Sequence, residues 1–245
     1  MRHILLTRYN IKFVPATKAG IDGLDPSWLD HRDRLFRTYC VPSVQSQDRR
    51  DFEWFVLFHP ATPRKYFDFL GGIAEVILTT NVGTAKKAIV GRRLFRRSIL
   101  MTRIDNDDCI AVDFVARSRT AAEQAIKGGY ANGRDFIIAP QRGAMAHLAS
   151  KRWRPALMLS PPFLSLFEGG RIWRERFTPL ELDHSNVPDR YPIVPIDDGA
   201  LLWLGLVHER NVRRKWIPED SDRDLTELAD RFPALKSALG LADSM

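Results

Sequence analysis

Residues 98–108 read Ser-Ile-Leu-Met-Thr-Arg-Ile-Asp-Asn-Asp-Asp, and this stretch decides how the rest of the chain is interpreted. An apolar run bounded by polar residues is typical of a buried strand, which we expect over residues 99–101. The acids that follow then lie where the strand leaves its sheet. Open α/β sheets bind their ligands at that edge. The stretch therefore predicts a ligand site at the edge of a sheet.

Asp105 and Asp107 are the acids best suited to hold a cation. They stand two residues apart, so an extended backbone points both side chains to one face. Two carboxylates on one face repel each other unless a cation lies between them. Such oxygen ligands suit Mg²⁺ or Mn²⁺, ions that often hold substrate phosphates as well. The alternative is a structural turn or helix cap, and Asp108 suits a cap as well as it suits a metal.

Composition narrows the class of protein. The chain has 245 residues, of which 44% are hydrophobic, enough for the core of one large domain. It lacks an apolar run near the roughly 18 residues of a membrane span. Two cysteines, Cys40 and Cys109, do not form a disulfide framework, so we expect a cytoplasmic protein. A net charge of +7 favours anionic partners, namely nucleotide phosphates, nucleic acid or an anionic membrane face.

The order of predicted elements indicates an α/β fold. Strands separated by helical connections predict βαβ units and a central, mostly parallel sheet flanked by helices. The strands are expected at residues 3–7, 53–58, 74–79, 99–101, 135–139, 144–148, 155–159, 178–182 and 201–207. The helices are expected from Trp28, with Ser27 as its cap, and at residues 84–97, 109–125 and 222–239.

One domain over residues 1–245 is the simplest organisation. Within it we expect a nucleotide-binding half at 1–108, an acceptor-side half at 109–220 and a C-terminal helix at 221–245.

Short segments along most of the chain share their order and spacing with a known family. They are Leu6-Thr-Arg-Tyr-Asn10, Arg34-Leu-Phe36, Phe52-Glu-Trp-Phe-Val-Leu-Phe58, Thr102-Arg-Ile-Asp-Asn-Asp-Asp108, Phe163-Leu-Ser-Leu-Phe-Glu168 and Trp203-Leu-Gly-Leu-Val-His208. Together they resemble the bacterial rhamnosyltransferase family of GT-A-type glycosyltransferases. The resemblance implies a GT-A fold, a nucleoside-diphosphate sugar donor and a divalent metal at the DxD-like acids. The chain departs from its relatives at His59, where many carry an acid, and at Gly205, where Gln is more usual.

Metal and donor residues are assigned from these patterns. Asp107 comes first and Asp105 second as metal ligands, with Asp105 also near the donor ribose. His208 is a candidate third ligand, and its alternative role is that of a hydrogen-bonded histidine at a strand end. Donor-binding residues are expected at the ends of the first strand and of the acidic strand: Thr7, Arg8, Asn10, Arg103 and Asp105. Arg103 would contact the diphosphate or pair with Asp105.

A glycosyl transfer that inverts the sugar also needs a base for the acceptor hydroxyl. Glu168 is the first candidate, since it ends an apolar segment and precedes Gly169-Gly170. Asp183 and its neighbour His184 come next. The alternative for Glu168 is a surface carboxylate paired with an arginine.

Three functions follow. The first is a metal-dependent glycosyltransferase that moves a sugar, rhamnose by the family's label, to a glycan or lipid-linked acceptor. This function is compatible with peripheral contact at the inner face of the membrane. The second is a catalytically inactive domain that binds a sugar nucleotide. The third, a nucleic-acid binder, is disfavoured because the aromatic residues fall in apolar runs and do not alternate with basic ones.

Overall fold

The computed structural model describes residues 1–17, 20–91, 98–130, 134–169, 178–181, 187, 189–211 and 216–241. The strands are β1 (Arg2–Arg8), β2 (Glu53–Phe58), β3 (Glu75–Leu78), β4 (Ile99–Asp105), β5 (Cys109–Ile110), β6 (Phe136–Pro140), β7 (Arg142–His147), β8 (Arg152–Leu157), β9 (Ser165–Glu168), β10 (Ile193–Ile196), β11 (Trp203–Val207) and β12 (Arg223–Asp224). The α-helices are α1 (Pro26–Leu35), α2 (Val41–Gln45), α3 (Val82–Gly91), α4 (Phe114–Lys127) and α5 (Ala234–Leu239).

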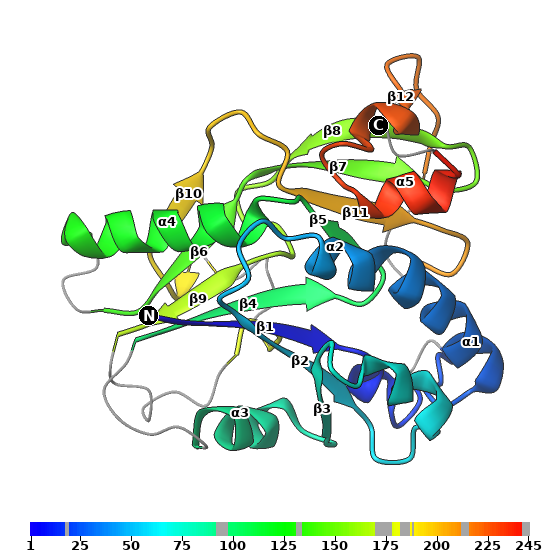
Figure 1. Ribbon diagram of the computed structural model, residues 1–245, viewed down its shortest axis with the longest axis horizontal. Helices are drawn as coiled ribbons and strands as arrows, with labels where there is room; N and C mark the ends of the chain where they lie inside the picture. Colours follow the sequence, from blue (N-terminus) through cyan, green and yellow to red (C-terminus); the bar gives the residue numbers. More distant parts are fainter. Residues whose placement is uncertain are drawn as a thin grey trace.

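The first sheet has seven strands in the order β10-β6-β9-β4-β1-β2-β3. Strand β9 is antiparallel to both of its neighbours, and the other pairs are parallel. The α/β architecture with a central, largely parallel sheet is therefore confirmed. Figure 1 shows α3 and α4 on opposite sides of this sheet. The two sides have separate apolar clusters, one containing Ile89 of α3 and the other containing Phe114 of α4.

Strand β4 is longer than predicted and lies in the middle of the sheet. It continues past residue 101 to Asp105, because Thr102 and Ile104 are fully buried while Arg103 and Asp105 are partly exposed and pair with each other. Its register with β1 places Arg8 directly beside Asp105. The carboxyl ends of the two central strands therefore bring a cation and an anion together at one edge.

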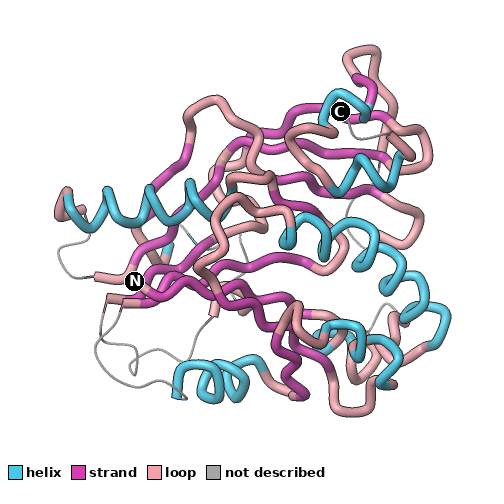
Figure 2. The backbone as a smooth tube through the Cα atoms, in the orientation of Figure 1, coloured by secondary structure: helices cyan, strands magenta, loops and turns pink. Residues whose placement is uncertain are grey.

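A second sheet has the order β12-β8-β7-β11-β5. Figure 2 shows the strands of both sheets in magenta. Trp203 of β11 is fully buried, and its ring stacks on Phe163 at 5.4 Å between centroids. The largest apolar cluster contains both of these residues together with residues of the first sheet. At Gly143 of β7, a Cβ atom would lie 2.1 Å from the Trp203 ring, so only glycine fits. The two sheets thus share one core.

Helix α1 begins differently from the prediction. Asp25, and not Ser27, is the N-cap: its Oδ1 accepts hydrogen bonds from the Trp28 backbone N–H at 2.9 Å and from the Ser27 hydroxyl at 2.6 Å. Pro26 occupies the first turn, a position where its missing N–H costs nothing. The helical path then continues through a π-helical segment, Phe36–Cys40, into α2.

Three other predicted elements need correction. Cys109–Ile110 is a strand paired with β11, so the helix predicted from residue 109 begins only at Phe114. The C-terminal helix predicted over 222–239 is limited to Ala234–Leu239, because Pro233 lacks an N–H and the segment before it forms β12 and a 3₁₀ turn, Leu225–Leu228. Residues 178–181 form a turn and not a strand, and residues 92–97 of the predicted basic helix lie outside the described residues.

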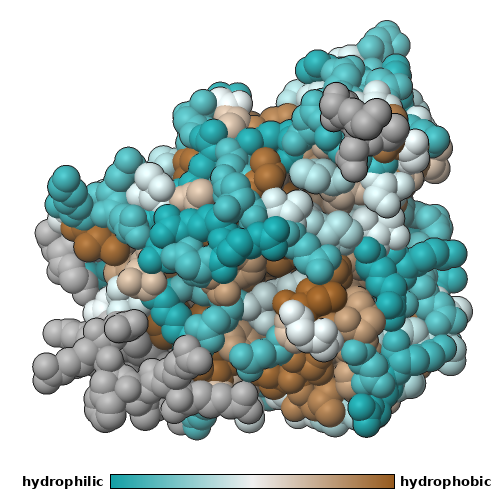
Figure 3. Space-filling model, viewed as in Figure 1, coloured by the Kyte–Doolittle hydropathy of each residue, from teal (hydrophilic) through white to brown (hydrophobic). Residues whose placement is uncertain are grey.

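No helix in the described part of the chain is both long enough and apolar enough to span a bilayer. Figure 3 shows one face of the molecule, on which hydrophilic residues predominate and apolar ones form separate patches. Among the most exposed large apolar side chains are Leu157 and Leu159, at the end of β8.

Candidate functional site

Arg8, Arg103 and Asp105 form a charged group at the carboxyl ends of β1 and β4. Arg103 donates two hydrogen bonds to Asp105, at 3.1 Å to Oδ1 and 2.9 Å to Oδ2. Arg8 donates to the Leu180 carbonyl at 2.9 Å. Burial alone would raise the pKa of Asp105, but the charges of Arg103 and Arg8 hold it below its ordinary value. Asp105 is therefore a carboxylate whose charge is already balanced by two arginines.

Asp107 belongs to a different group of contacts. The strand ends at Asp105, so the turn after it directs Asp107 to other partners, and the two acids do not share one face in the way an extended backbone predicts. Asp107 forms an ion pair with the buried Arg32 of α1. The turn itself is fixed by Asn106, which donates to the Tyr9 carbonyl at 3.1 Å and accepts from Arg32 at 3.3 Å.

His208 joins Asp107 from the other sheet. It follows β11, and its Nε2 lies 3.2 Å from Asp107 Oδ2. Asn211 holds the loop by accepting from the His208 backbone N–H at 2.5 Å. Asp108 accepts from the Leu206 backbone N–H at 2.8 Å, so it ties the acidic turn to β11 and does not cap the next helix, whose N-cap is Asp113. The structure thus brings together two of the three predicted metal ligands.

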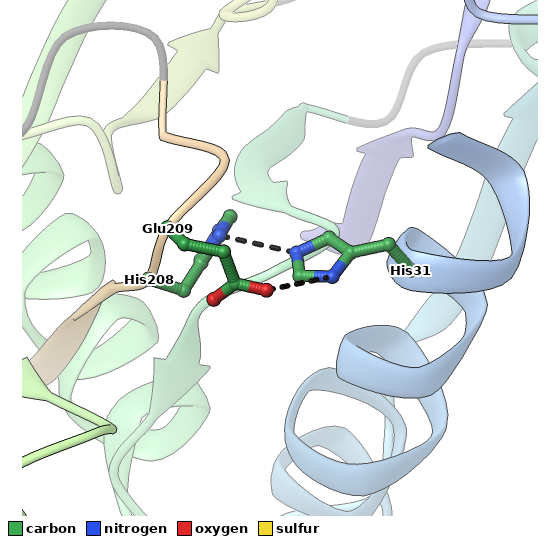
Figure 4. A group of neighbouring side chains, drawn as sticks. All are labelled: His31, His208 and Glu209. Carbon is green, nitrogen blue, oxygen red and sulfur yellow. Dashed lines mark hydrogen bonds and ion pairs between the residues drawn. The ribbon is translucent and has the colours of Figure 1, made fainter. Parts of the chain in front are cut away.

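His31 and Glu209 extend this group, and neither was predicted as a site residue. Figure 4 shows His31 projecting from α1 toward His208 and Glu209 on the loop after β11. His31 Nε2 lies 3.2 Å from His208 Nδ1, and His31 Nδ1 lies 3.4 Å from Glu209 Oε1. Within the described chain, the ligand atoms of these three residues all lie within 4.8 Å of one another. Burial, and then the charge of His208, lower the pKa of His31 to about 4.

Thr7 and Asn10 lie at the same edge, but their side chains form hydrogen bonds to other parts of the protein. Thr7 accepts a hydrogen bond from the Trp54 indole at 3.0 Å. Asn10 donates to the Gly23 carbonyl at 2.9 Å and to the Thr62 hydroxyl at 2.8 Å. It also accepts from the His59 backbone N–H at 2.9 Å. Asn10 therefore shapes the loops around the edge, and both residues are fully buried.

Glu168 lies at the opposite end of the sheet from the acids. Its register partner is Ile99, the first residue of β4, and six residue steps of about 3.3 Å put it roughly 20 Å from Asp105. It is buried and pairs with Lys86 at 2.7 Å. Because β9 runs antiparallel to β4, the end of the apolar segment points away from the site. Its position does not support the predicted role of base, and Asp183 and His184 lie outside the described residues.

In structure the chain is similar to TarS of S. aureus, with a TM-score of 0.49 and 12% identity over 84% of this chain and 37% of TarS. It is similar to residues 1–349 of TarS in complex with UDP, with a TM-score of 0.47 and 11% identity over 84% of this chain and 61% of that one. The chain therefore spans 37% to 61% of these TarS structures.

A third similar structure is 4-diphosphocytidyl-2C-methyl-D-erythritol synthase, with a TM-score of 0.39 and 14% identity over 80% of this chain and 89% of that one. None of the curated proteins compared with the chain matches it significantly in sequence. Residues 23–220 match the family model described as "Putative rhamnosyl transferase". This match covers well over half of the sequence, so the chain belongs to that family of glycosyltransferases, as the sequence motifs indicate.

Proposed function

We propose that this protein is a metal-dependent glycosyltransferase that moves a sugar, rhamnose by the family's description, from a nucleoside-diphosphate donor to a glycan or lipid-linked acceptor. One observation carries the proposal. Asp107 and His208 are 101 residues apart in sequence, yet they meet at 3.2 Å beside the carboxyl edge of the central sheet. Parallel sheets bind their ligands at this edge.

The donor set of Asp107 and His208 fits Mn²⁺ or Mg²⁺. A carboxylate suits either ion, and an imidazole favours Mn²⁺ of the two. Arg32 pairs with Asp107, so its guanidinium group balances the charge of this carboxylate when no metal ion is bound. When bound, the ion would act as a Lewis acid that takes up the negative charge of the leaving nucleoside diphosphate.

The arginines at the edge provide positive charge that matches the negative charge of the donor's diphosphate. Arg103 and Arg32 are positioned by carboxylates, Asp105 and Asp107, which hold their guanidinium groups in one geometry. Planar guanidinium groups bind phosphate oxygens in pairs, so these side chains favour a diphosphate over a neutral ligand. Arg8, beside Asp105, adds a third positive charge.

The acceptor base is proposed to be Asp183, the second of the two predicted carboxylates. Glu168 is less suited to this role, because its register partner is Ile99, at the opposite end of β4 from Asp105. Peripheral contact with the inner face of a membrane is also proposed, since a lipid-linked acceptor would lie there.

Binding of nucleoside diphosphates in the presence of Mn²⁺ tests the metal site directly. Titration calorimetry with UDP, GDP and dTDP should identify one that binds, and Asp107→Asn should weaken that binding by about 100-fold, or about 3 kcal/mol. Asp222→Asn is a matched control, because both aspartates are 8% exposed and both pair with an arginine. Equal binding by wild type and Asp107→Asn would refute the metal site.

Transfer from a panel of nucleotide sugars then separates an enzyme from the inactive binding domain. The transferase predicts release of the nucleoside diphosphate from one sugar nucleotide, dependent on Mn²⁺ and on Asp107. Tight donor binding with no release, in the presence of candidate glycan acceptors, would favour the binding domain.

A further inference from the structure

His208 has a second set of partners on the side of its ring that faces away from Asp107. Its Nδ1 lies 3.2 Å from Nε2 of the buried His31, which is 6% exposed. Glu209, next to His208 in sequence, reaches back to His31 Nδ1 at 3.4 Å. Two imidazoles and a carboxylate from two separate elements therefore lie side by side, with one ligand atom of each within 4.8 Å of the others (Figure 4).

The spacing of the two ring nitrogens matches the geometry of a metal ion. Two ligands at the corners of a tetrahedron, each about 2.0–2.1 Å from zinc, lie roughly 3.3–3.4 Å apart. The observed nitrogen separation is 3.2 Å. An ion would replace the proton that the two rings now share, and also the long hydrogen bond from the Arg210 backbone N–H to His208 Nδ1 at 3.3 Å.

The third ligand is free to adjust. The Glu209 side chain is 72% exposed, and its backbone follows directly on His208, so a rotation of this side chain alone changes where the carboxylate points. The imidazoles are more firmly placed, because His31 is held in α1 and His208 by Asn211 and Asp107. The cluster thus has two fixed nitrogen ligands and one adjustable oxygen.

Ligand type decides which ions this cluster selects. Imidazole nitrogens suit Zn²⁺, Ni²⁺ and Cu²⁺, whereas Mg²⁺ prefers carboxylate, carbonyl and water oxygens. Two histidines and one glutamate, with a fourth position open to water, form a common zinc ligand set. The Asp107–His208 pair on the other side of the ring offers one imidazole nitrogen, whereas the cluster offers two.

We propose that His31, His208 and Glu209 form a second cation site, which binds Zn²⁺ and similar ions and inhibits the enzyme. A neutral imidazole has one lone pair, so His208 serves either this site through Nδ1 or the Asp107 site through Nε2. Zinc at the second site therefore withdraws His208 from the catalytic ion. The inhibition rests on the function proposed above, but the zinc site itself does not.

Zinc titration of the full chain, after removal of metals with a chelator, tests the site. Wild type should bind one Zn²⁺ through the cluster, and Glu209→Gln and His31→Gln should each weaken it by at least about tenfold. Glu209→Gln changes an exposed side chain and leaves the fold intact. His147→Gln is the control, since His147 bonds to Ser150 at 2.8 Å and has no part in the cluster. Cobalt in place of zinc gives a second readout, the visible absorption of a tetrahedral site.

Asp107→Asn separates the two proposals, because it should retain zinc binding while it loses nucleoside diphosphate binding with Mn²⁺. Equal zinc affinity in wild type, His31→Gln and Glu209→Gln would overturn the second site. Zinc binding in the cluster without any nucleoside diphosphate binding would overturn the proposed function alone. Inhibition by Zn²⁺ that persists unchanged in Glu209→Gln would overturn the competitive mechanism.

Discussion

Four neighbouring residues show how differently similar side chains can act at a strand end. Asp105 is balanced by Arg103 and Arg8, and Asp108 holds the backbone of β11. Asn106 fixes the turn through the Tyr9 carbonyl. Asp107 meets a histidine, His208, which follows β11. The sequence predicts acids at an edge, but their division of roles depends on partners from α1 and β11 that lie far away in the chain.

His3 gives the molecule a dependence of stability on pH. Burial, followed by the charge of Arg119, lowers the pKa of His3 from 6.5 to about 3. As pH falls below about 6.5, the unfolded chain binds a proton on His3 that the folded protein does not bind, so the folded state loses stability. The contribution is fully present above pH 6.5. Between pH 8 and pH 5, this residue should cost the wild type about 2 kcal/mol of unfolding free energy.

Urea unfolding of His3→Gln at both pH values measures this effect. Glutamine can still contact the Thr102 hydroxyl, which lies 2.8 Å from His3 Nε2, but it cannot bind a proton. The variant should therefore show a smaller loss of stability between pH 8 and pH 5 than wild type. Identical losses in the two proteins would show that His3 is protonated in the folded state as readily as in the unfolded chain.

Among the elements, helix α1 contributes two buried residues to the site. It presents His31 and Arg32 to the β11 loop and to Asp107. Its N-terminus is fixed by Asp25, whose carboxylate accepts from the Trp28 N–H one turn before these residues. Changes at the cap should therefore affect both the stability and the site.

Asp25→Ala should lower the unfolding free energy by about 1 kcal/mol, the usual effect of losing an N-cap. Ser27→Ala, at the residue predicted from sequence to be the cap, should cost less, because the Ser27 hydroxyl contributes to the cap only through Asp25. Chemical denaturation of the two variants decides between them. A larger loss for Ser27→Ala would contradict the capping arrangement.

Strands were predicted better than helices and turns, for a physical reason. The strands at residues 53–58 and 203–207, and the start of β4 at residues 99–101, are apolar and largely buried on both faces, and such runs stand out in a sequence. The segment at 222–239 has the spacing of a helix, but tertiary contacts and Pro233 override it. Residues 178–181, predicted as part of a strand, form a turn, and Pro179 among them cannot donate to a strand ladder.

The site was predicted in part for the same reason. Asp107 and His208 follow apolar runs, so their positions at strand ends could be expected. His31 and Arg32 are on a helix whose charged residues look like a solvated face, and nothing in local spacing distinguishes them from Arg34 or Arg37. Their burial at 6% and 5% arises only when α1 packs against the acidic turn. The position of Glu168 beside Ile99 could not be predicted, because strand direction cannot be read from the segment that contains it.

At the scale of the whole molecule, the shared core links the two sheets. Trp203 of the second sheet lies in the same apolar cluster as Leu5 and Leu100 of the first. We therefore expect a single cooperative unfolding transition, in which far-UV and near-UV circular dichroism change together. Trp203→Leu should lower the midpoint measured by both signals equally. Two separated transitions would show that the halves unfold independently.

Asp107 and His208 are proposed to hold the ion that takes up the charge of the leaving diphosphate. Anomalous diffraction from crystals grown with Mn²⁺ and the nucleoside diphosphate that binds most tightly would locate this ion. We expect one manganese peak in contact with Asp107, His208 and the diphosphate oxygens. A peak that contacts Asp105 and not Asp107, or a diphosphate bound elsewhere with no metal at His208, would contradict it.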